Sequence, residues 1–210
     1  MKVIELQHDA VMLLTDTEEL IRQLLEDDQV LVYPTDTLYG LGVDAKSKAA
    51  VAKLYHLKLR ENAPVSVLLE STDQLLSMAE NLSNKAGKLI KQFLPGPMTV
   101  ICHSQYHFAP QLVSSRGTVG FRVPGDFISR RIAQLRGSPI TTTSVNPTGA
   151  TPATSLDEVS GYFKNQVALM LDIGPLKLSK GSTVIDLTTR PFKILREGEI
   201  TRQALREFLN

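Results

Sequence analysis

The apolar positions of this chain fall into short strand-like runs and into longer segments with helical spacing. We expect strands at 3–6, 30–33, 65–69, 98–102, 119–123, 140–143, 167–171, 184–187 and 192–195. Helical spacing predicts one helix carrying Leu20 to Leu25, another carrying Val51 to Tyr55, and further helices at 83–93, 128–135, 156–163 and 202–209. Strands interleave with helices over most of the chain, while several strands follow one another late. This order favours an α/β fold with a mixed sheet.

Local signals place several element boundaries. Thr15 with Glu18, and Asp16 with Glu19, form two overlapping capping-box patterns before the first helix. Ser47 is expected to cap the second helix. Pro34 should end a strand, and the LPGP stretch at 94–97 should end the helix before it. We find no internal repeat or linker-like stretch, and 210 residues suit one domain spanning 1–210.

The charge balance excludes little by itself. The chain has 23 basic and 22 acidic residues, so no global field predicts a nucleic-acid or membrane partner. The single cysteine, Cys102, lies in an apolar run and is expected to be buried; a disulfide framework and a cysteine zinc site are excluded. No secretory signal and no apolar run of about 18 residues is present. We therefore expect a cytoplasmic protein.

Two polar segments follow apolar elements in the first third of the chain. The segment 34–42 carries threonine hydroxyls and glycines, and Lys58 and Arg60 follow the second helix. If the backbone is extended at 58–60, the Lys58 ammonium and the Arg60 guanidinium point to one side and suit a polyphosphate. An ordinary turn at 34–42 and a solvated helix end at 58–60 are the structural alternatives.

A third polar segment, 141–149, follows a later strand. Pro147 favours extended backbone at Asn146, so Ser144 and Asn146 should share one face while Val145 faces the core. This density of polar side chains at a strand end favours a functional loop, with a polar turn as the alternative.

A fourth candidate pairs Ser182, which opens a late strand, with Arg196, which closes the next, so that both would reach a shared mouth. The Walker-type and dinucleotide glycine motifs are absent, as is the Gly-x-Ser-x-Gly elbow of acyl hydrolases. His103 and His107 are four residues apart, but they lie in a loop without a nearby carboxylate. We therefore expect no metal held by protein side chains.

Taken together and in order, these segments resemble the YrdC-like family of threonylcarbamoyl-AMP synthases. The resemblance runs from about Val30 to Ile200. The matching stretches are YPTDTLYGLG at 33–42, KLR at 58–60, LPGPMT at 94–99, GFRVP at 120–124, SVN at 144–146, STVID at 182–186 and LREG at 195–198. Each stretch is a weak signal, whereas seven in this order and spacing are specific.

The resemblance implies a twisted, open α/β sheet with one large concave cleft. It also implies a nucleotidyltransferase that joins L-threonine, bicarbonate and ATP into threonylcarbamoyl-AMP and releases pyrophosphate. Mg²⁺ would accompany ATP, held by the phosphates. The product would pass to tRNA threonylcarbamoyl transferase proteins that modify an adenosine in tRNA.

The resemblance further implies the residues of the site. The catalytic centre would contain Lys58, Arg60, Ser144 and Asn146. ATP would be bound by Lys58, Arg60, Thr118, Ser144 and Arg196. L-threonine would be bound by Thr37, Arg122, Thr142 and Ser182, with Arg122 pairing its carboxylate.

Three departures from the family pattern concern these pockets. Glu61 follows Arg60 where the family has proline, Leu68 aligns with a position where many members carry histidine, and Pro147 replaces a serine. Two alternatives stay open: a YciO-type paralogue with weak or altered synthase activity, and a module that binds double-stranded RNA. The paired Ser144 and Asn146 favour the synthase, and the near-neutral charge argues against strong RNA binding.

Overall fold

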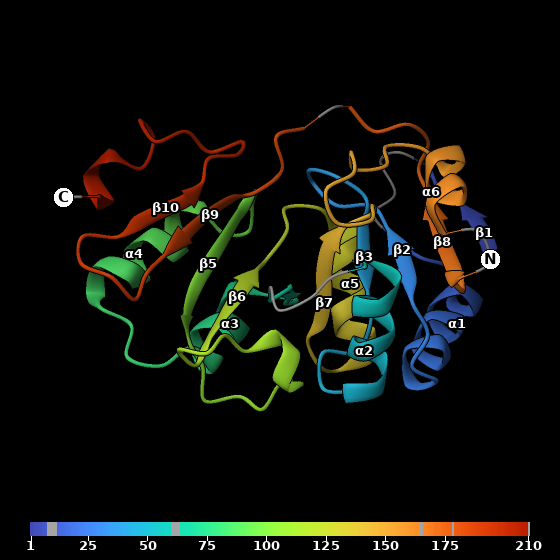
Figure 1. The fold of residues 1–210 in the computed structure, drawn as a ribbon, viewed down its shortest axis with the longest axis horizontal. Helices are drawn as coiled ribbons and strands as arrows, with labels where there is room; N and C mark the ends of the chain where they lie inside the picture. The colour runs from blue at the N-terminus through green and yellow to red at the C-terminus, as the bar shows by residue number, and fades with distance from the viewer. Residues whose placement is uncertain (8–11, 60–63, 164–165, 178, 210) are drawn as a thin grey trace.

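A single mixed sheet runs through the molecule, with helices on both of its faces (Figure 1). The computed structural model describes residues 1–7, 12–59, 64–163, 166–177 and 179–209. Over these residues the sheet has ten strands, in the order β1 (Lys2–Glu5), β8 (Leu169–Asp172), β2 (Leu31–Tyr33), β3 (Gly40–Gly42), β7 (Ile140–Ser144), β4 (Ser66–Leu68), β6 (Thr118–Arg122), β5 (Met98–His103), β9 (Thr183–Asp186) and β10 (Lys193–Arg196).

Parallel and antiparallel pairs alternate irregularly across this sheet. The pairs β1–β8, β2–β8, β4–β6 and β5–β9 are parallel. The pairs β2–β3, β3–β7, β4–β7, β5–β6 and β9–β10 are antiparallel. The expected mixed α/β sheet is therefore confirmed.

The described helices are α1 (Thr15–Glu26), α2 (Lys48–Leu57), α3 (Thr72–Met78), α4 (Asn84–Phe93), α5 (Phe127–Arg136) and α6 (Leu156–Phe163). Ser47 caps α2 as expected, because its hydroxyl accepts a hydrogen bond from the Ala50 amide at 3.1 Å. The Ser83 hydroxyl does the same for α4.

Strand alternation separates two apolar cores on opposite faces of the sheet. On β2, Leu31 and Tyr33 pack with α1 and α5, whereas Val32 faces the other side. That other side is the larger core and takes the buried residues of α2, α3, α4 and α6. Each helix thus packs its apolar side chains against the apolar side chains on one face of the sheet. Cys102 is buried in the larger core, as expected.

Two expectations about helices are wrong. Helix α1 has Leu14 as its N-cap with no side-chain cap, so Thr15 and Asp16 lie inside the first turn. The two glutamates of the predicted patterns have other partners: the Glu18 carboxylate accepts two hydrogen bonds from Arg131 of α5, at 2.7 Å each, and Glu19 pairs with Arg22. The helix expected at 202–209 is only a short 3₁₀ turn, Arg206–Phe208.

The segment 34–42, expected as a loop, contains strand β3. Two of the three β3 residues are glycines, which weakens any sequence signal for a strand. Their role is steric, because a Cβ on Gly42 would lie 2.5 Å from the Tyr33 ring. The Tyr33 ring crosses β3, and its hydroxyl donates to the Thr141 carbonyl at 2.9 Å.

Candidate functional site

A cleft of about 650 Å³ lies on the sheet face that carries α1 and α5. Its floor comes from alternate residues of the central strands: Thr118 and Arg122 of β6 point into it, whereas Val119 and Phe121 between them point into the larger core. Among the described residues that line it, the charged ones are all cations: Arg116, Arg122, Lys180 and Arg196. The cleft therefore favours an anionic ligand.

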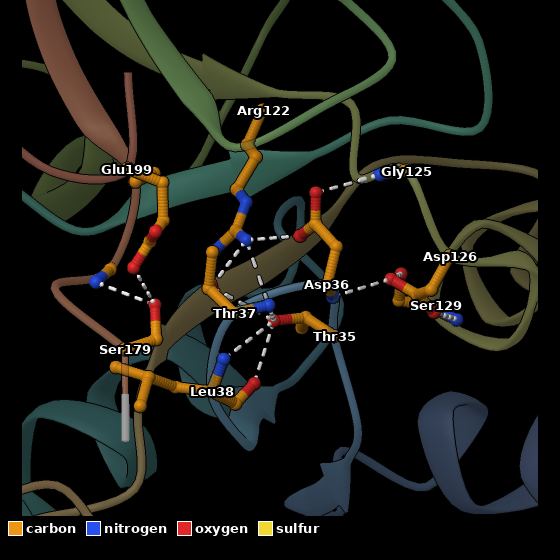
Figure 2. Close-up of polar contacts among 12 residues, drawn as sticks. Thr35, Asp36, Thr37, Leu38, Arg122, Gly125, Asp126, Ser129, Ser179 and Glu199 are labelled. Atoms are coloured by element: carbon orange, nitrogen blue, oxygen red, sulfur yellow. Dashed lines mark hydrogen bonds and ion pairs between the residues drawn. The ribbon is translucent and has the colours of Figure 1, made fainter. Parts of the chain in front are cut away.

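At one end of β6, the Arg122 guanidinium is held by the loop after β2 (Figure 2). Its Nη2 donates to the Asp36 carboxylate and to the Thr37 hydroxyl, the latter at 2.6 Å. The Thr35 hydroxyl lies at 3.4 Å from the same nitrogen. Arg122 Nε is buried and has no hydrogen-bond partner among the described residues.

A second carboxylate, Asp126, supports this loop from the start of α5. It caps α5 by accepting from the amide and hydroxyl of Ser129, at 2.8 and 2.6 Å, and it also accepts from the Asp36 amide at 3.1 Å. Burial raises the pKa of Asp126 above its usual value, and the neighbouring Asp36 charge adds to this effect, although the Ser129 hydrogen bonds oppose it. Neither carboxylate lines the cleft.

Arg196 and Ser182 meet at the same end of the cleft, as expected. Arg196 Nη2 donates to the Ser182 carbonyl at 2.8 Å and lies 3.1 Å from the Ser182 hydroxyl. That hydroxyl is also hydrogen-bonded to Thr99 at 2.8 Å. Burial lowers the pKa of Arg196, and the positive charge of Arg122 lowers it further, so two guanidinium groups share this end. Two cations held this close favour a carboxylate or phosphate between them.

The far end of β6 holds a cation that sequence reasoning missed. Arg116 lines the cleft with its side chain 61% exposed, and its Nη2 donates to the buried Asp186 carboxylate at 3.1 Å. Burial alone would raise the pKa of Asp186, but hydrogen bonds from Thr188 and the Arg116 guanidinium hold it below its usual value. Beside them, the Thr118 and Ser114 hydroxyls are 2.7 Å apart. In sequence Arg116 lies in an ordinary polar turn, and only the sheet pairing reveals its place.

The Ser144 and Asn146 side chains contact each other at the end of β7. The Ser144 hydroxyl donates to Asn146 Oδ1 at 2.6 Å, and the Asn146 amide nitrogen donates to the Pro147 and Ala150 carbonyls. Val145 is fully buried in the core, as expected. Ser144 lines the cleft, whereas Asn146 lies behind it and stabilises the loop.

Lys58 stands behind this loop and is not among the residues that line the cleft. It is 2% exposed, and its ammonium donates to the Ser144 and Asn146 carbonyls at 2.6 and 2.8 Å. The Lys58 carbonyl in turn accepts from the Thr148 amide at 2.9 Å. Lys58 thus fixes the loop through both its side chain and its backbone.

The extended backbone expected at 58–60 is not found where it is described. Lys58 has helical dihedral angles as the C-cap of α2, and Leu59 has a φ of 49°, in the left-handed region. The described backbone at 58–59 is therefore not extended. Arg60 and Glu61 lie outside the described residues.

Two residues before β9, Ser179 and Lys180, also line the cleft. They are held by Glu199, whose carboxylate accepts from the Ser179 hydroxyl at 2.7 Å and the Lys180 amide at 2.8 Å. Lys180 was missed in the sequence, because a lysine in a polar loop is usually solvated.

The structure thus gathers most of the expected site residues in one cleft. Those that line it are Thr37, Thr118, Arg122, Thr142, Ser144, Ser182 and Arg196. Lys58 and Asn146 do not line it, but both are hydrogen-bonded to Ser144, which does. Leu68, at the position where many family members carry histidine, is buried in the core beneath α1 and α5 and takes no part in the lining.

Comparison with known proteins identifies the family. A model of the Sua5, YciO and YrdC proteins, described as "Telomere recombination", matches residues 23–198. The chain belongs to the Sua5/YciO/YrdC family. The resemblance read from the seven sequence stretches is therefore confirmed.

Three relatives place the chain within this family. A putative threonylcarbamoyl-AMP synthase of Methanocaldococcus jannaschii is 33% identical over 188 residues, which are 89% of this chain and 88% of that protein. The structure of Pyrococcus abyssi Sua5 complexed with L-threonine matches with a TM-score of 0.91 and 25% identity, over 100% of this chain and 61% of that one. Escherichia coli YciO matches with a TM-score of 0.85 and 25% identity over the whole of both chains. The chain thus spans less than two thirds of Pyrococcus abyssi Sua5.

Within the described ranges, no helix is both long and apolar enough to cross a membrane.

Proposed function

We propose that this protein joins L-threonine, bicarbonate and ATP into threonylcarbamoyl-AMP with release of pyrophosphate, a nucleotidyltransferase reaction. The observation that carries the proposal is the cleft itself, whose described charged residues are all cations and whose two ends offer different donors. Relatives in the same family are named threonylcarbamoyl-AMP synthases, and one was crystallised with L-threonine.

The threonine end of the cleft is the one built around Arg122. In the proposed complex the substrate carboxylate pairs with the Arg122 guanidinium, and the Thr37, Thr142 and Ser182 groups hydrogen-bond the rest of the amino acid. This placement is supported by Arg122 itself, a nearly buried cation that lines the cleft beside the Thr37 hydroxyl.

The nucleotide occupies the other end, near Thr118 and Ser144, with its α-phosphate toward Arg196. Threonine and bicarbonate first combine to the carbamate and water; a carbamate oxygen then attacks the α-phosphorus, and the bond to the β-phosphate oxygen breaks. Negative charge gathers as these groups meet, so fixed cations and positioning supply the catalysis. No protein nucleophile is required. Arg60 belongs to this proposal from the resemblance alone.

Mg²⁺ is expected to enter with ATP. The described lining residues of the cleft include no carboxylate, and no group of three or more His, Cys, Asp or Glu side chains in the described ranges is placed to hold a metal ion. The residues therefore do not fit a protein-held metal, and phosphate oxygens would be the ligands of the ion.

The product of the proposed reaction is made for tRNA modification. We therefore propose that the protein acts in the cytoplasm and that its product passes to tRNA threonylcarbamoyl transferase proteins. Direct RNA binding is the competing function. The four cations of the cleft favour it, whereas the net charge of +1 disfavours it. Tight RNA binding with a steep salt dependence, without adenylate formation, would support that alternative.

The test is pyrophosphate release from ATP, measured with each substrate omitted in turn. Release should require both L-threonine and bicarbonate. Arg122→Ala should abolish the response to L-threonine, whereas Arg22→Ala, on the exposed side of α1, should leave it unchanged. Release that is indifferent to L-threonine in the unmodified protein would refute the proposal.

A further inference from the structure

The Arg122 guanidinium is held in place within the protein itself, mainly by the side chain of Asp36. The Asp36 carboxylate accepts a hydrogen bond from Arg122 Nη2 through Oδ1 and one from the Gly125 amide, at 2.9 Å, through Oδ2 (Figure 2). The same carboxylate therefore ties the guanidinium to the backbone just beyond the end of β6. The Asp36 amide completes the arrangement by donating to Asp126.

The rest of the loop has little freedom to move Asp36. The Thr35 hydroxyl donates to the Leu38 carbonyl at 2.6 Å and accepts from the Thr37 and Leu38 amides at 3.2 Å each. Thr35 is buried, and so is Thr37. The loop after β2 is thus closed on itself and locked to the start of α5, with the Asp36 carboxylate held between them.

These contacts divide the donors of Arg122 into two sets. Nη2 is used within the protein by Asp36 and Thr37. Nε is buried without a partner among the described residues. Since guanidinium is planar, fixing Nη2 also fixes the direction in which Nε points. One part of the group is thus anchored, while the Arg122 side chain still lines the cleft.

We infer that Asp36 is a positioning residue for substrate carboxylate recognition: by anchoring Arg122 Nη2 it presents the remaining donors of Arg122 to the carboxylate of the amino-acid substrate. This inference rests on the proposed function. Asp36 does not line the cleft and does not touch the substrate; it acts through Arg122. A preset donor group binds its carboxylate without losing rotamer freedom at that moment.

The first experiment measures the binding of L-threonine and of ATP separately by calorimetry, for the unmodified protein and for Asp36→Asn. This substitution keeps the shape of the side chain and removes its charge. The dissociation constant for L-threonine should rise roughly tenfold to a hundredfold, as expected for a lost charged hydrogen bond, whereas that for ATP should change less than about threefold.

A second ligand tests whether the effect passes through the carboxylate. L-threoninol has a hydroxymethyl group in place of the carboxylate, so Asp36→Asn should not weaken its binding further. Ser129→Ala is the matched control, because it removes a 2.6 Å contact to Asp126 in the same cluster without touching Arg122. It should lower the melting temperature and leave the affinity for L-threonine unchanged.

Equal weakening of L-threonine, L-threoninol and ATP by Asp36→Asn would overturn the inference, as would unchanged L-threonine affinity. If Asp36→Asn does not fold, Asp36→Ala, which also removes the charged contact to Arg122, carries the same comparison. Failure of the unmodified protein to bind L-threonine at all would refute the proposed function instead, so the two failures are distinct.

Discussion

Replacing Lys58 by methionine separates two roles for this residue. The resemblance implies a direct contact with the triphosphate, whereas in the structure the ammonium is buried against the Ser144 and Asn146 carbonyls at 2.6 and 2.8 Å. A phosphate ligand can be removed at little cost to the fold. An internal clamp cannot, because its loss leaves two carbonyls without a charged donor.

The magnitude follows from these two hydrogen bonds. Bonds to a charged group contribute about 1.5–3 kcal/mol each, and part of that is recovered because the buried ammonium no longer has to be desolvated. We therefore expect Lys58→Met to lower the free energy of unfolding by about 2–4 kcal/mol. For a chain of this length that corresponds to a melting temperature lower by about 5–15 °C.

Urea unfolding followed by far-UV circular dichroism measures this loss, since the chain has no tryptophan for fluorescence. Lys53→Met is the matched control: it lies on the same helix, and its ammonium donates to the Asp28 carbonyl at an exposed site. Its effect should stay within about 0.5 kcal/mol. If Lys58→Met is as stable as Lys53→Met yet no longer binds ATP, Lys58 is a direct phosphate ligand and our reasoning is wrong.

Three further predictions concern stability and reactivity. Gly198→Ala would place a Cβ 2.2 Å from the Gly181 carbonyl oxygen, so we expect a loss of about 1–3 kcal/mol by calorimetry, and an unchanged melting temperature would contradict this packing. The Arg131 hydrogen bonds lower the pKa of Glu18, so the pair stabilises the fold above the unfolded pKa of about 4.3 and is lost as pH falls through the folded value. Glu18→Gln should therefore cost about 0.5–1 kcal/mol at pH 7 and nothing near pH 2, as measured by urea unfolding; a cost that persists in acid would argue against the ion pair. Burial, with a smaller effect of the Asp186 charge, raises the pKa of Cys102 to about 12, so a thiol reagent at pH 8 should react only after unfolding.

Short apolar runs were sufficient to predict most of the sheet. Strand β2 is buried on both faces and reads as a continuous apolar run, whereas in β6 Val119 and Phe121 alternate with residues that face the cleft. Strand β3 was missed because two of its residues are glycines. A Cβ at either position would crowd the Tyr33 ring that crosses the strand. The terminal helix was wrongly predicted because Leu205 and Phe208, three residues apart, suit a 3₁₀ turn equally well.

The candidate site divides in the same way. Residues at strand ends, such as Ser144, Ser182 and Arg196, could be selected from sequence because loops at strand ends often carry function. The role of Lys58 could not, because Lys58 keeps helical dihedral angles as the C-cap of α2 and its ammonium donates to carbonyls 86 and 88 residues away in the sequence. Arg116 was missed for a related reason, because its partner Asp186 is 70 residues away in the sequence. Arg116 precedes β6 and Asp186 ends β9, and β5 lies between these two strands in the sheet.

The most direct test of the proposed function is the identity of the product. The protein is incubated with ATP, L-threonine and carbon-13 bicarbonate. The nucleotides are then separated, and their masses are measured by mass spectrometry. We predict threonylcarbamoyl-AMP carrying a single carbon-13 atom, with an equal amount of pyrophosphate. ADP, or AMP that forms without L-threonine and carries no label, would contradict the proposed function.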